Sequence, residues 1–227
     1  MFSGHFAIAL LIKALYPKIP TTSIIWGAEW IDVINGIFGM AGINRITPNP
    51  QATPYMFVDL DFMDYDHSLA ATVFWSIIWS LLFISHGRKT MLVAGLSSMA
   101  HWLADWPFHN SDLALYPHSS IRFGMGLWGK LGTTAWIIEA VFCLVLCIIV
   151  WRLNEKRGVS YRWAFIFQMA LVFQLTPWTS PLHYVFQLPR PFADRLAAAM
   201  VFVGSVIPSI IMTRLVDTAE EKKDKKN

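Results

Sequence analysis

The residues of this chain with the clearest chemical potential are a few ionisable side chains in otherwise apolar segments. His101 and Asp105 are four residues apart, so on a helix both side chains share one face. Asp32 lies in another apolar run, where a carboxylate needs a cation or a proton. Side chains of these types bind zinc, manganese or iron. Six residues are therefore candidate metal ligands or proton carriers: His5, Asp32, His67, His101, Asp105 and Glu139.

A metal held by such side chains would be suited to activate water for a hydrolysis reaction. Bound zinc lowers the pKa of its water to near 7 and so makes hydroxide available at neutral pH. A carboxylate beside that water serves as the base. The chain has no GxSxG, P-loop or HExxH motif, so serine hydrolases, P-loop nucleotide hydrolases and zincins have no motif support.

Each candidate also has a purely structural interpretation. His101 and Asp105 could form a hydrogen bond inside a protein core. His67 could be a histidine at the membrane interface, because Asp66 or Ser68 beside it is suited to cap the next helix.

The two acids within apolar runs have similar alternatives. Asp32 could be neutral and paired with Asn35. Glu139 could pair with Lys130 or Arg122 instead of binding a metal.

Two further histidines have weaker claims to the site. His5 is so close to the N-terminus that an interfacial role is an open alternative. His109 follows Pro107, which is expected to end or kink the helix before it, so an exposed loop position is an alternative to metal binding. Three acids that precede His67 are expected to be solvated loop residues: Asp61, Asp64 and Asp66.

The composition indicates a membrane protein. Of 227 residues, 55% are hydrophobic and only 15% are charged, which is too apolar for an ordinary soluble domain. We predict an all-α bundle of six or seven membrane helices. Residues 1–216 would form one integral-membrane domain, and 217–227 a charged cytoplasmic tail. The expected spans are 2–16, 23–41, 68–85, 91–106, 131–151, 162–177 and 196–213.

The distribution of Lys and Arg orients these spans. With the N-terminus outside, thirteen Lys and Arg lie on the cytoplasmic side and five on the outer side. Because cytoplasmic loops carry the positive excess, this orientation is favoured, with the C-terminal tail in the cytoplasm. All six candidate residues then fall within roughly 14 Å of the outer boundary, at the 1.5 Å rise of a helix. The sequence therefore predicts one polar site that opens outward.

The order of these motifs resembles a known family. The segments Trp26–Asp32, Tyr65–Leu69, His101–Asp105 and Gly124–Trp128, together with His5, are similar to the bacterial YdjM-like membrane-bound metal-dependent hydrolases. That group distantly resembles zinc-dependent phospholipase C and the zinc nucleases of its superfamily. The resemblance covers about residues 1–140 and implies a protein of the bacterial inner membrane.

The resemblance assigns roles to single residues. It implies that Asp32 is both a ligand and the base on the metal-bound water. The other implied ligands are His5, His67, His101 and Asp105, with His109 and Glu139 as additional ones. The chain departs from the pattern at two positions: Ile31 replaces the proline before the motif aspartate, and Asn44 replaces an expected acid.

Three functions remain open at this stage. The first is a zinc-dependent, or manganese- or iron-dependent, hydrolase of a phosphoester or lipid-like substrate, with Arg45 and Arg122 as candidate phosphate-binding residues. The same arginines could instead contact lipid headgroups. The second is a transporter or complex subunit whose polar residues bind an ion or relay protons, and the third is a structural partner in a membrane-protein complex. Membrane lipids are expected partners, whereas a net charge of +3 gives no signal for nucleic acid.

Overall fold

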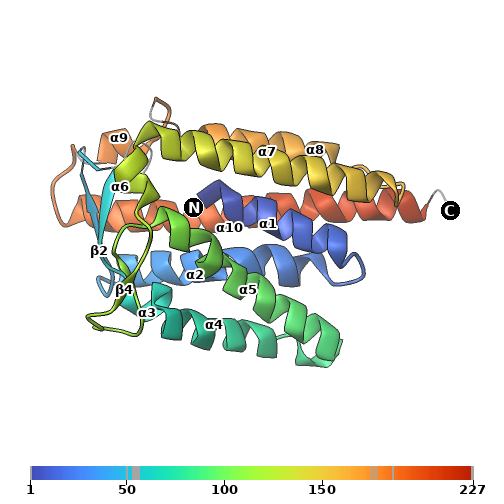
Figure 1. The fold of residues 1–227 in the computed structure, drawn as a ribbon, viewed down its shortest axis with the longest axis horizontal. Coiled ribbons are helices and arrows are strands. Elements are labelled where there is room, and N and C mark those ends of the chain that lie inside the picture. The colour runs from blue at the N-terminus through green and yellow to red at the C-terminus, as the bar shows by residue number, and fades with distance from the viewer. Residues whose placement is uncertain are drawn as a thin grey trace.

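The computed structural model describes residues 2–49, 51, 52, 57–174, 176, 178–185 and 187–225. Within them the chain is mostly helical, which confirms the predicted all-α class. Seven helices of 13 residues or more lie along the long axis of the molecule (Figure 1). They are α1 (Phe2–Leu15), α2 (Thr21–Met40), α4 (Leu69–Leu81), α5 (Arg88–Phe108), α7 (Thr133–Glu155), α8 (Arg162–Gln174) and α10 (Phe192–Asp224).

Most of the short elements gather at one end of this bundle (Figure 1). Strand β1 (Arg45–Pro48) pairs antiparallel with β2 (Val58–Phe62), and β3 (Leu113–Ala114) pairs antiparallel with β4 (Arg122–Phe123). The short helices α3, α6 and α9 lie at the same end. We call it the strand end, and the opposite one the tail end, because α10 projects there. The bounds of these helices are Asp64–His67, Leu127–Leu131 and Leu182–Val185, and the short 3₁₀ turn η1 at the tail end spans Ile84–His86.

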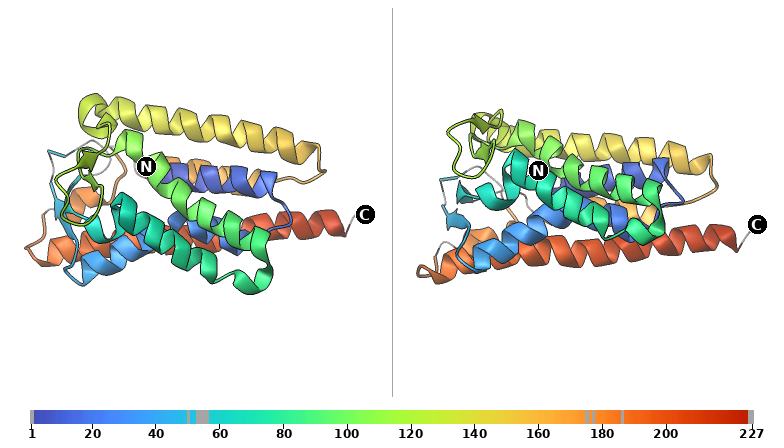
Figure 2. Two further views of the ribbon diagram at one scale, coloured as in Figure 1. Left: turned by 60° about the horizontal axis from the view of Figure 1, so that its bottom comes forward. Right: turned by 90° about the horizontal axis from the view of Figure 1, so that it is seen from below.

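All seven apolar runs of the sequence contain a helix in the structure, with shifted ends, and residues 175 and 177 of the run 162–177 lie outside the described residues. Helix α5 includes Pro107 and ends at Phe108. The prediction that the helix ends before His109 is therefore confirmed, but the helix does not end at Pro107. Helix α10 continues to Asp224, so the tail expected over 217–227 begins as the last turns of a helix. Figure 2 shows α10 running the length of the bundle and extending beyond it.

Two local features bring the polar helices into position. Ser68 is the N-cap of α4, and its hydroxyl accepts a hydrogen bond from the amide of Ala71, which fixes the chain immediately after His67. Helix α10 packs tightly on α2 because Gly36 has no side chain: a Cβ there would lie 2.7 Å from the backbone nitrogen of Phe202. Small residues allow such close approach between packed helices.

The bundle has an apolar core and an apolar outer surface. Phe6, Leu10 and Ile24 are fully buried in the largest core cluster. Many large apolar side chains also face outward, for example Phe74 and Ile77 on α4. Within the described residues, two helices are long and apolar enough to cross a membrane alone, α7 and α10. The others of the six or seven expected spans are too short or, like α5, carry too many polar residues.

Candidate metal centre

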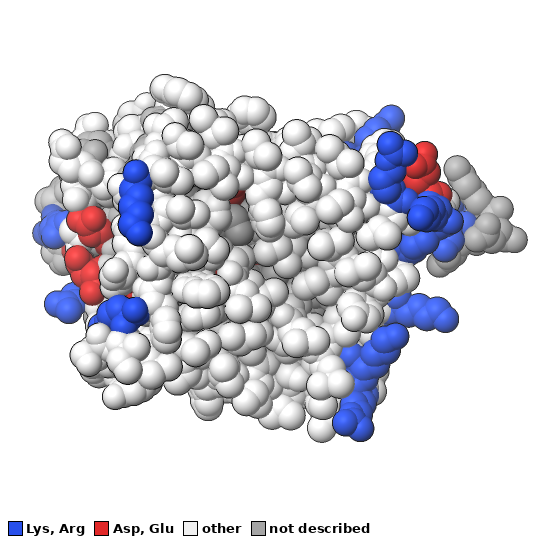
Figure 3. Space-filling model, viewed as in Figure 1, with Lys and Arg blue, Asp and Glu red and all other residues white. Residues whose placement is uncertain are grey.

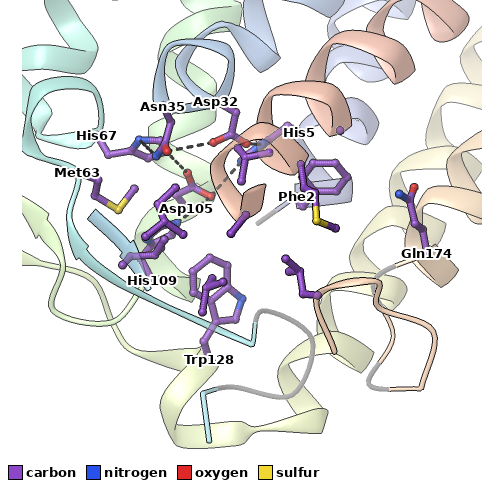
Figure 4. Close-up of a pocket in the computed structure, with 18 of the residues that line it drawn as sticks. Phe2, His5, Asp32, Asn35, Met63, His67, Asp105, His109, Trp128 and Gln174 are labelled. Carbon is purple, nitrogen blue, oxygen red and sulfur yellow. Dashed lines mark hydrogen bonds and ion pairs between the residues drawn. The ribbon is translucent and has the colours of Figure 1, made fainter. Parts of the chain in front are cut away.

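The structure brings five of the predicted ligands together, from four different helices. His5 comes from α1, Asp32 from α2, His67 from α3, and His101 and Asp105 from one face of α5. Figure 4 shows those that line the cavity pointing toward one another. Four of the five side chains are at most 1% exposed, and Asp32 is 15% exposed.

His101 presents a bare ring nitrogen to the cluster. Its Nδ1 lies 2.7 Å from the backbone carbonyl of Ala28, which can only accept a hydrogen bond, so Nδ1 carries the proton. The lone pair is then on Nε2, which lies 3.1 Å from Oδ2 of Asp105. A hydrogen bond of this kind to the other ring nitrogen is how proteins orient a metal-binding histidine.

His67 is held in the same way by a carboxylate. Its Nδ1 donates to Oδ2 of Asp66 at 2.8 Å, and Asn44 donates to Oδ1 of the same carboxylate at 2.8 Å. Nε2 of His67 therefore also faces the cluster, 3.3 Å from Nε2 of His101. Two imidazole nitrogens whose other nitrogens are committed cannot face each other at this distance unless a proton or a metal ion lies between them.

Without a metal, a proton would take that place on His67. Burial disfavours the charged imidazole, but the carboxylates of Asp66 and Asp32 outweigh burial and raise the pKa of His67 to about 10. A site that holds a proton this strongly attracts cations in general. Metal ligands must be deprotonated, so binding of a metal ion here would release that proton.

Three donor atoms have separations that suit one metal ion. Oδ1 of Asp32 lies 3.4 Å from Nε2 of His67 and 3.7 Å from Nε2 of His101, and the two Nε2 atoms are 3.3 Å apart. Ligands about 2.0–2.2 Å from zinc are separated by about 3.3–3.6 Å, which is close to these distances. Oδ2 of Asp105 lies 3.1 Å from Nε2 of His101 and 3.7 Å from Nε2 of His67, which makes it the candidate fourth donor. The donor set therefore fits a divalent metal.

His5 lies beside this group and links it to a residue that the sequence analysis missed. Its Nε2 is 3.0 Å from Oδ1 of Asp105, and its Nδ1 is 3.8 Å from Oδ2 of Asp32 and 3.9 Å from Oε1 of Glu29. Glu29 is completely buried. It is three residues before Asp32 and so on the same face of α2, a spacing that could have identified it.

A cavity of about 110 Å³ opens beside the cluster. Asp32, His67 and Asp105 line one side of it. Much of the remaining wall is apolar and comes from the strand end and from α10, and includes Leu60, Met63, Trp128, Met200 and Val201 (Figure 4 labels Met63 and Trp128). The polar cluster thus borders an apolar space, as in a site for an amphipathic molecule.

His109 is at the edge of the site. It is the C-cap of α5 and is 3% exposed, so the alternative of an exposed loop histidine is wrong. Its Nε2 lies 3.6 Å from Oδ1 of Asp105, and its Nδ1 lies 3.1 Å from Oδ1 of Asp112. Its ring contacts Trp128 and lines the cavity, which places it near the cluster but beyond the inner four donors.

Three predicted site residues lie elsewhere. Glu139 is buried on α7, where one carboxylate oxygen accepts hydrogen bonds from Ser3 and from the amide of Gly4. These partners differ from the Lys130 or Arg122 that the alternative interpretation expected. Arg122 pairs with Asp64 at 2.6 Å, so its guanidinium is already engaged. The third, Arg45, is exposed and lies over the ring of Phe62. Neither arginine lines the cavity.

The acids before His67 differ from expectation. Asp64 and Asp66 are completely buried, so the prediction that they are solvated is wrong. The physical reason is that each is paired: Asp66 holds the ring of His67, and Asp64 holds Arg122 and the amide of His118. Asp61 is exposed, as predicted, and pairs with the hydroxyl of Thr47.

Comparison of the chain with protein-family models, with curated proteins and with solved structures finds no match.

Proposed function

We propose that this protein is a membrane-embedded, metal-dependent hydrolase that acts on an amphipathic phosphoester. The observation that carries the proposal is the pair of opposed Nε2 atoms of His67 and His101, 3.3 Å apart, each with its Nδ1 already donating a hydrogen bond. The carboxylates of Asp32 and Asp105 complete the donor set. The resemblance to the YdjM-like hydrolases belongs to this proposal, with zinc as the leading metal.

The distribution of apolar side chains supports a membrane location. On α5, Leu92, Leu96 and Leu103 are 50–63% exposed, whereas His101 and Asp105 on the opposite face are buried. A soluble helix would have the reverse arrangement. The inverted arrangement also explains why α5 could cross a bilayer although it is not uniformly apolar, since its polar face is satisfied inside the protein.

Charge distribution supports the same location. Figure 3 shows that on this face almost all Lys, Arg, Asp and Glu lie near the two ends, with an uncharged belt between them. Basic residues mark the tail-end termini of several helices, including Arg88 on α5, Arg152 on α7 and Lys222 on α10. With the positive excess in the cytoplasm, the strand end and the metal centre face outward. The spans in this proposal are α1, α2, α4, α5, α7, α8 and α10.

The site residues have distinct roles in this proposal. His67, His101 and Asp105 would hold the metal, which would supply a water of lowered pKa. Asp32 is the most exposed of the inner donors and lines the cavity, so its carboxylate is placed to hold the ion and to accept the proton of a water that enters from the cavity. The apolar wall beside it would accommodate the lipid-like part of the substrate.

One observation favours a second function. With Asp105 as a fourth donor beside Asp32, His67 and His101, protein side chains would fill a tetrahedral shell, as in sites that hold an ion without activating water. A non-catalytic ion-binding membrane protein, such as a transporter or a complex subunit, is therefore the second candidate. It predicts stoichiometric metal without hydrolysis.

Metal analysis and a substrate screen test the proposal. Protein purified in detergent is expected to contain zinc, manganese or iron, and His101→Ala is expected to contain less, because it loses the ion held by His67 and His101. His86→Ala is the matched control, because His86 is at the tail end and its ring bonds only to Ser85 among the described side chains. Metal-dependent cleavage of lipid phosphodiesters, absent in His101→Ala, would support the hydrolase. Metal without cleavage of any phosphoester would favour the second candidate, and a natural chain without metal would refute both.

The membrane topology has a separate test. Lys130→Cys at the strand end and Arg88→Cys at the tail end, in a chain with Cys143 and Cys147 replaced by Ala, would be exposed to a membrane-impermeant maleimide on intact cells. We expect labelling of the first and protection of the second. The opposite pattern would reverse the orientation, and labelling of both would argue against a membrane-spanning bundle.

A further inference from the structure

Glu29 is a buried acid that the proposed chemistry does not use. It is 0% exposed, and neither of its carboxylate oxygens makes a hydrogen bond of standard geometry among the described residues. The hydroxyl of Ser205 on α10 is a neighbour, but it makes no such bond either. A buried carboxylate without a partner is costly, so Glu29 must hold either a proton or a cation.

The atom that faces Glu29 is another acceptor. Nε2 of His5 lies 3.0 Å from Oδ1 of Asp105, and because a carboxylate accepts hydrogen bonds, this nitrogen carries the proton. The lone pair of His5 is then on Nδ1, which is buried and makes no hydrogen bond among the described residues. Nδ1 faces the carboxylates of Glu29 and Asp32, so an imidazole lone pair and two carboxylates converge on one point.

The distances distinguish a shared cation from a shared proton. Nδ1 of His5 is 3.9 Å from Oε1 of Glu29 and 3.8 Å from Oδ2 of Asp32, beyond the reach of a hydrogen bond. Two donors that each lie about 2.0–2.2 Å from one metal ion can be separated by up to about 4.2 Å. The observed separations therefore suit a common metal ion and do not suit a bridging proton.

We propose that His5, Glu29 and Asp32 hold a second divalent metal ion, so that the centre is binuclear. This inference rests on the proposed function in one respect: Asp32 is shared between the two sites. Its Oδ1 faces His67 and His101, and its Oδ2 faces His5, so each oxygen serves one ion. Paired metal ions of this kind are common in enzymes that cleave phosphoesters.

The two ions would share one cavity as well as Asp32. His5 and Asp32 line it beside the second ion, and Asp32, His67 and Asp105 line it beside the first. Glu29 is completely buried and lies outside the cavity wall. The second ion would therefore be held from the protein interior by Glu29, and it would keep Asp32 in place for the first ion.

Metal counting tests this inference with a matched pair of variants. The natural chain loaded with manganese is expected to hold two ions, Glu29→Gln one, and Glu139→Gln two. Glu139 is the control because it is an equally buried glutamate whose carboxylate bonds to Ser3 and Gly4. An unchanged metal count in a folded Glu29→Gln would refute the second site.

A measurement on the natural chain covers the case in which Glu29→Gln does not fold. Two manganese ions that share a carboxylate give an exchange-coupled electron paramagnetic resonance spectrum, whereas a single ion gives the isolated six-line signal. A six-line signal at full loading would refute the binuclear centre and leave the hydrolase proposal intact. A coupled signal in a protein that cleaves no phosphoester would support the second site and refute the hydrolase. A chain that binds no metal would refute both.

Discussion

The two ends of the bundle both bury charged side chains, but they treat them differently. At the tail end, Arg157 donates to both oxygens of Glu220 at 2.7 and 2.8 Å, and the hydroxyl of Tyr161 donates to the same carboxylate. Lys13 donates to the carbonyls of Pro17 and Ile19. Burial, together with the neighbouring Glu220, raises the pKa of the Tyr161 hydroxyl, so it remains a donor at neutral pH.

At the strand end, acceptors face acceptors. The Nε2 atoms of His67 and His101 oppose each other, and Nδ1 of His5 faces the carboxylate of Glu29. A polar network in which every donor meets an acceptor stabilises the fold and needs nothing else. A network in which lone pairs converge is incomplete without a cation. This difference distinguishes a structural cluster at the tail end from a binding site at the strand end. Both consist of ionisable side chains in an apolar sequence.

Removal of one carboxylate from each end tests this difference with the largest expected effect. Asp32→Asn is expected to lower metal-dependent hydrolysis by about 1000-fold, because it removes a ligand and the candidate base together. Asp217→Asn at the tail end, where the carboxylate accepts a hydrogen bond from Thr21, is expected to leave the rate within about 2-fold. The measurement is the initial rate of cleavage at saturating metal. Equal losses in the two variants would contradict the division between the ends.

Metal should stabilise the fold through the strand end alone. An ion that binds only the folded state stabilises it by about 2.7 kcal/mol at a concentration 100 times its Kd. We expect the thermal midpoint of the metal-free natural chain to rise when zinc or manganese is added. That of His67→Ala should rise less, because this variant keeps only the site of His5, Glu29 and Asp32. Glu220→Gln should start from a lower midpoint and show the same rise as the natural chain. A similar rise in His67→Ala would place the ion elsewhere.

The sequence predicted the level of the site along the bundle better than the direction of each side chain. Helix rise converts residue number into position along the bundle, so His5, Asp32, His101 and Asp105 could be placed at one level before their neighbours were known. The direction in which each side chain points depends on how the helices are rotated against one another. Glu139 is an example: it points toward Ser3 and Gly4 on α1 rather than toward α5.

The residues that the sequence analysis misjudged are those whose burial depends on tertiary partners. Asp64 and Asp66 are in a segment rich in acids, which is typical of a solvated loop. They are nevertheless buried, because Arg122 pairs with Asp64 and His67 pairs with Asp66. Glu29 lies in the same apolar run as Asp32, so the argument that a carboxylate there needs a cation or a proton applied to it equally. A glutamate three residues before a buried aspartate on one helix is a signal that could have been used.

The carboxylate of Asp66, which holds the ring of His67, gives a finer test of the strand end. Asp66→Asn keeps an oxygen for the ring of His67 but removes the charge, and is expected to weaken metal binding by between about 10-fold and 100-fold. Asp64→Asn is the control: it is equally buried and two residues away, but it serves Arg122. It should reduce thermal stability and leave the metal Kd unchanged. Isothermal titration of both metal-free variants measures the difference, and equal affinities would remove Asp66 from the site.

The smallest expected effect belongs to the tail end. Arg157 and Glu220 are each 19% exposed, so solvent screens part of their attraction. Arg157→Met is expected to lower the free energy of unfolding by about 1–2 kcal/mol, because it leaves Glu220 with Tyr161 as its remaining donor among the described residues. The double variant Arg157→Met with Glu220→Gln should recover part of that loss, since no carboxylate is then left without its cation. Metal content and cleavage rate should match the natural chain in both. If instead Arg157→Met lost the metal, the two ends would be coupled along the helices, and the tail-end cluster would have to be counted as part of the site.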